Sequence, residues 1–127
     1  MKATPPRASE VELALIKEYA LLPIALTVLE HDKSAIQKAA SLKMGPVYSQ
    51  LLDNVMNMIS HDFSGVRKEL RKSGIKVHLA EKTKEELRIE HFCRGYQGQM
   101  ILRWDYIKAE LTERIASYCY VNIHKDG

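Results

Sequence analysis

The spacing of apolar residues changes at Gly74, and this change constrains the fold more than any other feature of the sequence. Upstream, apolar residues recur every three or four positions, which predicts one long amphipathic helix that Ser73-Gly74 ends. Its predicted core-facing stripe is Val47, Leu51, Val55, Ile59, Phe63, Val66 and Leu70. Downstream, apolar and polar residues alternate in 75–80 and 87–94, which predicts a β-hairpin near 75–94. Together the two periods predict an α+β fold.

A first helix is predicted from Ser9 to about Glu30. The segment 9–12 has the spacing of a capping box, in which a serine hydroxyl and a glutamate satisfy each other's backbone amides. Pro23 lies inside this helix, and an internal proline removes one amide donor and crowds the preceding turn. We therefore expect a kink or a break into two helices near 19–22.

A second helix is predicted to begin at Asp32 or Ser34 and to end at Gly45-Pro46, because glycine favours a helix C-terminus and proline the first turn of the next helix. Downstream of the hairpin we expect a loop over 95–98, a last helix over about 99–118, and a short strand over 120–123.

Composition predicts one soluble domain. The chain has 127 residues, of which 46% are hydrophobic and 28% charged, and a chain of this length buries enough surface to fold without disulfides or metal. We expect a flexible leader over 1–8 and a single globular domain over 9–127. The predicted fold class is α+β and mainly helical, with three to four helices, the hairpin and a C-terminal helix.

Cysteine usage and the longest apolar segment indicate a cytoplasmic location. Cys93 and Cys119 are far apart and form no CxxC motif, so they suggest neither a disulfide framework nor a zinc site. The N-terminal residues lack the apolar run of a signal peptide. The longest apolar stretch, 19–29, is well short of the roughly twenty residues that span a bilayer. We therefore expect no membrane association.

No enzyme motif is recognisable in the sequence, which has no GxSxG, phosphate-binding loop or HExxH pattern. We therefore predict a non-enzymatic protein without catalytic, cofactor-binding or metal-binding residues. The nearest approach to a metal site would join His78 to His91 and Cys93, but strand alternation places His78 on the opposite face of the hairpin. The full group of candidate side chains is His61, Asp62, His78, His91, Cys93 and His124.

The formal net charge of +3 is concentrated in one segment, 67–76, which has five cations and one acid. Its cations form a predicted patch for an acidic partner or a phosphate backbone: Arg67, Lys68, Arg71, Lys72 and Lys76. The alternative is a solvated helix end, because cations near the last carbonyl groups of a helix are favoured by its dipole.

The predicted order of elements, three helices and then a hairpin, resembles a winged helix-turn-helix over residues 9–94. The resemblance implies a DNA-binding regulator whose third helix enters the major groove. However, the corresponding helix over 47–58 contains no lysine or arginine, and Asp53 would lie among phosphates. DNA binding is therefore the alternative hypothesis, with nucleic acid as the alternative partner.

A regulatory module that acts through protein–protein contacts agrees better with the sequence, with self-association as one form of contact. Met56 and Met58 lie partly off the predicted stripe, and methionine adapts well to binding surfaces. A second candidate is an interaction loop formed by Arg94, Tyr96 and Trp104, in which Arg94 would pair with Asp105. The alternative for Trp104 is a core anchor, since a lone tryptophan in a small domain usually packs inside.

Overall fold

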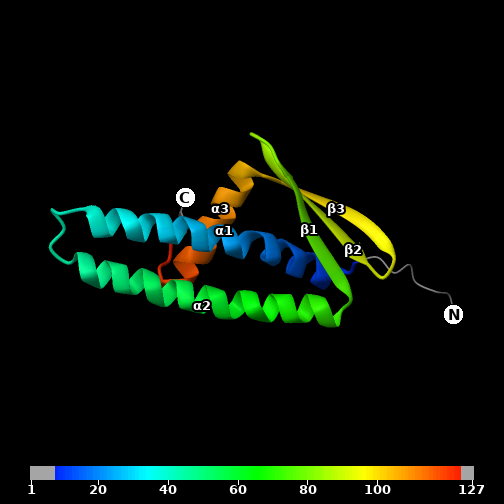
Figure 1. The fold of residues 1–127 in the computed structure, drawn as a ribbon, viewed down its shortest axis with the longest axis horizontal. Coiled ribbons are helices and arrows are strands. Elements are labelled where there is room, and N and C mark those ends of the chain that lie inside the picture. The colour runs from blue at the N-terminus through cyan, green and yellow to red at the C-terminus, as the bar shows by residue number, and fades with distance from the viewer. Residues whose placement is uncertain (1–7, 124–127) are drawn as a thin grey trace.

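Two long antiparallel helices and a three-stranded antiparallel sheet make up most of the fold (Figure 1). The computed structural model describes residues 8–123. Helices α1 (Glu10–Lys38) and α2 (Gly45–Lys72) form a hairpin, and strands β1 (Ile75–Lys82), β2 (Glu86–Cys93) and β3 (Tyr96–Arg103) follow in spatial order. Helix α3 (Trp104–Tyr118) crosses the hairpin at mid-length. The prediction of a mainly helical α+β fold is confirmed, with three helices in the described part of the chain.

Helix α1 is continuous, so of the predicted kink or break near 19–22 the break into two helices is wrong, and so is the separate second helix. The capping box is present: the Ser9 Oγ accepts from the Glu12 amide at 3.1 Å, and Glu12 accepts from the Ser9 amide at 2.9 Å. Pro23 lies within the helix between buried turns that contain Leu21, Leu22 and Ala25. Because this tertiary packing surrounds the proline, the helix persists despite the missing amide.

Helix α2 is the long helix that the apolar stripe predicted. Pro46 lies in its first turn, where a missing amide removes no internal bond. Since two helices rather than three precede the sheet, the element order that resembled a winged helix-turn-helix is not present. None of the helices within residues 8–123 is long and apolar enough to cross a bilayer.

The sheet extends further than predicted, because β3 occupies the segment expected to be a loop and the start of the last helix. Arg94 and Gly95 have φ values of 49° and 89°, which is typical of a tight two-residue hairpin turn. The chain then pairs along β2, from Tyr96 opposite Cys93 to Arg103 opposite Glu86. The predicted hairpin of β1 and β2 is confirmed, with Ile75 opposite Cys93.

One face of the sheet forms part of the core, and on this face the side chain of His91 lies against Gly98. The alternating residues Leu87, Ile89, His91 and Cys93 of β2 are all buried. His91 lies opposite Gly98 of β3. A Cβ atom at Gly98 would lie only 2.4 Å from the Cε1 of His91, so the imidazole occupies the space that any other residue would need.

Helix α3 ends in a turn closed by a non-glycine residue. Tyr120 has a φ of 60°, and the Val121 amide donates to the carbonyl of Ala116 at 2.8 Å, as in a Schellman motif. Residues 121–123 form no strand, so the predicted C-terminal strand is wrong. Of the predicted leader, residues 1–7 lie outside the described residues.

Candidate interaction surface

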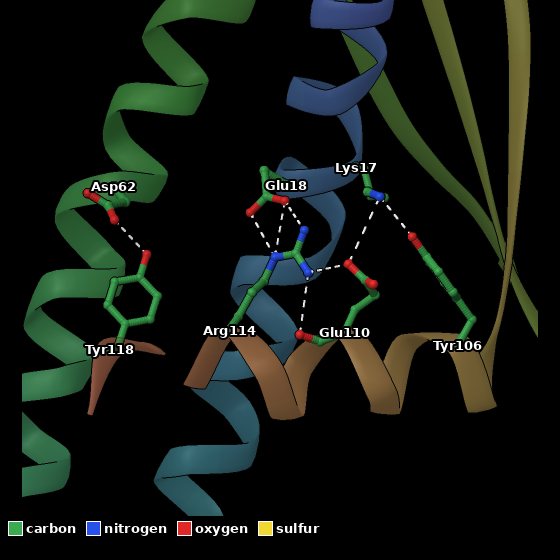
Figure 2. A network of polar contacts seen from close by, with 7 residues as sticks. All are labelled: Lys17, Glu18, Asp62, Tyr106, Glu110, Arg114 and Tyr118. Carbon is green, nitrogen blue, oxygen red and sulfur yellow. Dashed lines mark hydrogen bonds and ion pairs between the residues drawn. The ribbon is translucent and has the colours of Figure 1, made fainter. Parts of the chain in front are cut away.

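A network of polar contacts fastens α3 onto the helical hairpin (Figure 2). Arg114 of α3 forms an ion pair with Glu18 of α1, its Nε donating at 3.1 Å, and its Nη1 also donates to Glu110 at 2.5 Å. Lys17 donates to the Tyr106 hydroxyl at 2.7 Å. The network thus ties two turns of α3 to one turn of α1.

The contact between α3 and α2 is made by a tyrosine. The Tyr118 hydroxyl donates to the Asp62 carboxylate at 2.5 Å. Partial burial, and then this bond to an anion, raise the pKa of Tyr118 well above its usual value of 10. The hydrogen bond to Glu18 likewise raises the pKa of Arg114. Both shifts favour the protonated forms, which are the forms that donate these hydrogen bonds.

Beyond α3, no element within residues 8–123 covers the helical hairpin. Within residues 30–54, which we call the distal half, only Gly45 and Ser49 are buried. The proximal half, residues 10–29 and 55–72, contains all the buried apolar side chains of α1 and α2. In Figure 1 the sheet and α3 lie over the proximal half, and the distal half projects past them.

An apolar surface therefore lies on the distal half. Part of the stripe that was predicted to face the core belongs to this surface instead. Val47 is 61% exposed and Leu51 46% exposed, although both were predicted to face the core. Met58 is exposed, whereas Met56 is half-buried against the core. Five exposed residues of the distal half, together with Met58 in the adjoining turn of α2, form what we call the distal surface: Leu42, Met44, Val47, Tyr48, Leu51 and Met58.

The distal surface begins where α3 ends. Helical spacing places Asp62, Met58 and Leu51 on one face of α2, and Asp62 is the residue that Tyr118 contacts. A surface hollow of about 600 Å³ is lined by Met58 together with Tyr118 and Tyr120. The apolar stripe therefore extends outward from the fastening network to the tip of the hairpin.

The distal surface is also poor in charge. Residues 44–52 contain no charged side chain. The next residue, Asp53, forms an ion pair with Lys33 of α1 at 2.7 Å. Depletion of charge together with exposed methionine and tyrosine is typical of the centre of a protein–protein interface.

An apolar groove of about 620 Å³ lies between α1 and α3. Exposed apolar residues at its margins are Val28 of α1 and Val121 and Ile123 of the C-terminal segment. Among its lining residues only Lys108 is charged. We call this feature the α1–α3 groove, and its lining is Ile24, Val28, Trp104, Ile107, Lys108, Leu111, Thr112, Ile115, Ala116, Cys119, Val121 and Ile123.

The predicted basic patch lies at the opposite end of the hairpin, where α2 leads into β1. Its five side chains, Arg67, Lys68, Arg71, Lys72 and Lys76, are all exposed. The Arg67 guanidinium lies 5.8 Å from the centroid of the Phe63 ring, and Lys72 lies 3.9 Å from Glu69. The structure brings these cations to one end of the molecule, and their binding role stays a prediction.

The three residues of the predicted interaction loop do not lie together in the structure. Arg94 and Tyr96 lie at the start of β3, whereas Trp104 follows its other end. Arg94 pairs with Glu12 of α1 at 3.0 Å, so the predicted pair with Asp105 is wrong. The Trp104 indole packs against the core and donates to the Thr83 carbonyl at 2.7 Å, as expected of a core anchor.

His91 is buried on the sheet face that it shares with Leu87 and Ile89, as strand alternation predicts. Strand pairing places it opposite Val77, while His78 lies opposite Glu90 on the other face, as strand alternation predicted. Burial lowers the pKa of His91, which favours the neutral form of the imidazole. Within residues 8–123 no group of three or more His, Cys, Asp or Glu side chains is arranged to hold a metal ion.

The fold and the surface define a class of protein: a small α+β protein with a helical hairpin that is fastened at one end and bare and apolar at the other. Residues 7–123 match the family model described as YhjD protein, and the chain belongs to this family. It is similar to the Bacillus subtilis (strain 168) protein named "Uncharacterized protein YhjD", with 26% identity over 115 residues that cover 91% of this chain and 95% of that relative. No solved structure matches the chain.

Proposed function

We propose that the protein is a non-enzymatic, regulatory interaction module that acts through protein–protein contacts, and that a second copy of the chain binds at the distal surface. The observation that carries this proposal is the exposure of Val47 and Leu51 in a helical stripe whose continuation, from Val55 onward, is buried. Large exposed apolar patches on soluble proteins commonly mark interaction sites.

Burial of this surface would be favourable. Fully burying one large aliphatic side chain contributes roughly 1.5–3 kcal/mol, and several exposed side chains of the distal surface are of this kind. Because residues 44–52 are uncharged, no charged pair has to lose its water when they are covered.

Charge distribution favours a second copy as the partner. Two uncharged distal surfaces meet without like-charge repulsion, whereas two basic patches would repel each other. Since the basic patch lies at the other end of the hairpin, contact through the distal halves keeps the patches of two copies apart. The same lack of cations on the distal part of α2 argues against the DNA-binding alternative.

The test is the concentration dependence of mass in solution, measured by sedimentation equilibrium. We expect the wild-type chain of 14.5 kDa to approach twice that mass as concentration rises, and the variant Val47→Asp/Leu51→Asp to stay monomeric with an unchanged circular dichroism spectrum. The matched control is Val11→Asp, since Val11 is 73% exposed at the opposite end of α1. A wild-type monomer at every concentration, or an aspartate variant that associates normally, would contradict the proposal.

We also propose that the protein works in the cytoplasm. Cys93 and Cys119 are both free thiols, as expected for a protein that folds in a reducing compartment.

A further inference from the structure

We infer that the basic patch is a second binding site, separate from the distal surface, and that it binds the phosphate backbone of a single-stranded nucleic acid. The site lies at the end of the molecule where α2 leads into β1, and Phe92 on the outer face of the sheet adjoins it. All of its residues belong to one copy of the chain, so the inference does not depend on self-association.

The arginines of the basic patch differ from the other arginines in the described part of the chain. Four arginines elsewhere within residues 8–123 each form an ion pair with a carboxylate: Arg88, Arg94, Arg103 and Arg114. Within the same residues Arg67 and Arg71 have no carboxylate partner, and neither do Lys68 and Lys76. Four cations of the patch are therefore left for an anion from outside the molecule.

The helix dipole accounts for only part of this charge. Its effect falls off within the last turn of a helix, and the cations in the last turn of α2 are Arg71 and Lys72. Arg67 and Lys68 lie one turn earlier, and Lys76 lies in β1. A solvated helix end therefore explains two of the five cations, and the other three need a different reason.

The two arginines are arranged to contact successive phosphates. They lie four residues apart, hence on one face of α2 and about 6 Å apart along the helix axis. The Arg67 guanidinium lies 5.8 Å from the centroid of the Phe63 ring, which packs against the core, and this cation–π contact restricts its position. A guanidinium group donates two parallel hydrogen bonds to phosphate oxygens, which makes arginine well suited to this anion.

An exposed aromatic side chain adjoins the cations. Phe92 is 40% exposed and pairs with Lys76 of β1 and Gln97 of β3, so the three exposed side chains share the outer face of the sheet. Bases of single strands stack on such aromatic side chains, whereas an acidic peptide or a lipid surface has no bases to stack. The next outer-facing pair joins His78 to Glu90, whose carboxylate limits the site to this end of the sheet.

The salt dependence of binding measures the number of phosphate contacts. Fluorescence anisotropy gives the affinity of the full chain for a labelled oligouridylate of about twelve nucleotides, at about 50 mM and about 200 mM salt. With four contacts the wild-type affinity should fall roughly 50-fold between the two, and with two contacts, in Arg67→Gln/Arg71→Gln, roughly sevenfold. The matched control Lys82→Gln/Lys84→Gln removes the same charge at two exposed positions at the other end of β1, and should keep the wild-type ratio.

A second variant tests the aromatic contact. Phe92→Ala should weaken binding roughly tenfold at the lower salt concentration and leave the salt dependence unchanged, because a stacked base is lost while the phosphate contacts remain. The control is Ile101→Ala, since Ile101 is 48% exposed and lies opposite Arg88 on the same face. A duplex of the same length should bind more weakly than the single strand, because its bases already stack on each other. Circular dichroism checks that each variant keeps the wild-type fold.

The remaining outcomes would overturn the inference. These are a wild-type chain that does not bind oligouridylate at the lower salt concentration, an arginine variant with the wild-type salt dependence, and a duplex that binds as tightly as the single strand. Labelled polyglutamate that binds as tightly as oligouridylate would identify an acidic protein as the partner instead. Vesicles containing phosphatidylserine that bind where oligouridylate does not would identify a membrane surface. If Phe92→Ala bound like the wild type, the sheet face would take no part, and the assignment to single strands would fail.

Discussion

The proximal and distal halves of the hairpin are built from the same two helices, yet only the proximal half has a core. In the proximal half Leu21 and Ile59 are completely buried, because α3 and the sheet pack over them. In the distal half the same helical period continues through Val47 and Leu51, which face solvent. The difference shows that apolar periodicity predicts which face of a helix the apolar side chains occupy. It does not predict whether another part of the protein covers that face.

Polar contacts differ between the halves in the same way. The proximal half is joined to α3 and to the β2–β3 turn by Arg114, Tyr118 and Arg94, each of which contacts a carboxylate of α1 or α2. On the distal half, Lys33 of α1 forms an ion pair with Asp53 of α2, and Gln50 donates to Asn54 within α2.

The largest expected difference comes from one substitution made in each half. Leu21→Ala should lower the free energy of unfolding by about 2–5 kcal/mol, because it leaves a cavity in the core. Leu51→Ala should lower it by less than about 0.5 kcal/mol, as is usual for surface positions. Urea unfolding at concentrations where the chain is monomeric measures both. Equal losses would show that the distal half also has a well-packed interior.

A smaller effect is expected from breaking the fastening of α3. Arg114→Met leaves the carboxylates of Glu18 and Glu110 without this partner and should cost about 1–3 kcal/mol. Amide hydrogen exchange should accelerate in α3 and stay unchanged over 30–54. The control Arg103→Met removes an exposed pair with Asp105 and should have almost no effect. Faster exchange in the distal half would contradict the separation of the halves.

The smallest effect is expected from acid. The hydrogen bond from Arg94, followed by that from the Ser9 amide, lowers the pKa of Glu12 from 4.5 to about 2. A lowered carboxyl pKa stabilises the fold above the unfolded-state value, and this contribution is lost as pH falls from 4.5 to about 2.

Glu12→Gln should therefore flatten the dependence of the melting temperature on pH within that interval, with Glu10→Gln in the same turn as the control. Because Arg94 lies in the β2–β3 turn, low pH should first weaken the contact between this turn and the start of α1. If the Glu12 variant kept the wild-type pH profile, the ion pair would make no contribution to the pH dependence of the melting temperature.

The elements that were predicted correctly are those whose capping and periodicity in the sequence agree with the packing around them in the fold. The Ser9 cap, helix α2 and the hairpin of β1 and β2 all appear where periodicity and capping place them. The prediction that α1 forms two helices was wrong, because it considered the missing amide of Pro23 without the packing around this residue. Strand β3 was missed because Ile101 and Trp104 also fit a helical period, and because Arg94 is an unusual residue for a turn with positive φ.

The candidate site could be predicted only in part. Methionines outside the core and an uncharged start of α2 were visible in the sequence, and Met58 is indeed exposed. The exposure of Val47 and Leu51 could not be read from periodicity, because it depends on where α3 ends. The pairing of Arg94 with Glu12 joins residues 82 positions apart, and no local pattern indicates such a contact.

The close approach of His91 to Gly98 has a consequence for how this family can diverge. Because a methyl group at position 98 would overlap the imidazole, an exchange of Gly98 requires the His91 ring to move or the side chain at position 91 to become smaller. A substitution of Gly98 without either change gives an overpacked intermediate. The two positions are therefore expected to vary as a pair, and the order of their substitutions in a lineage is constrained.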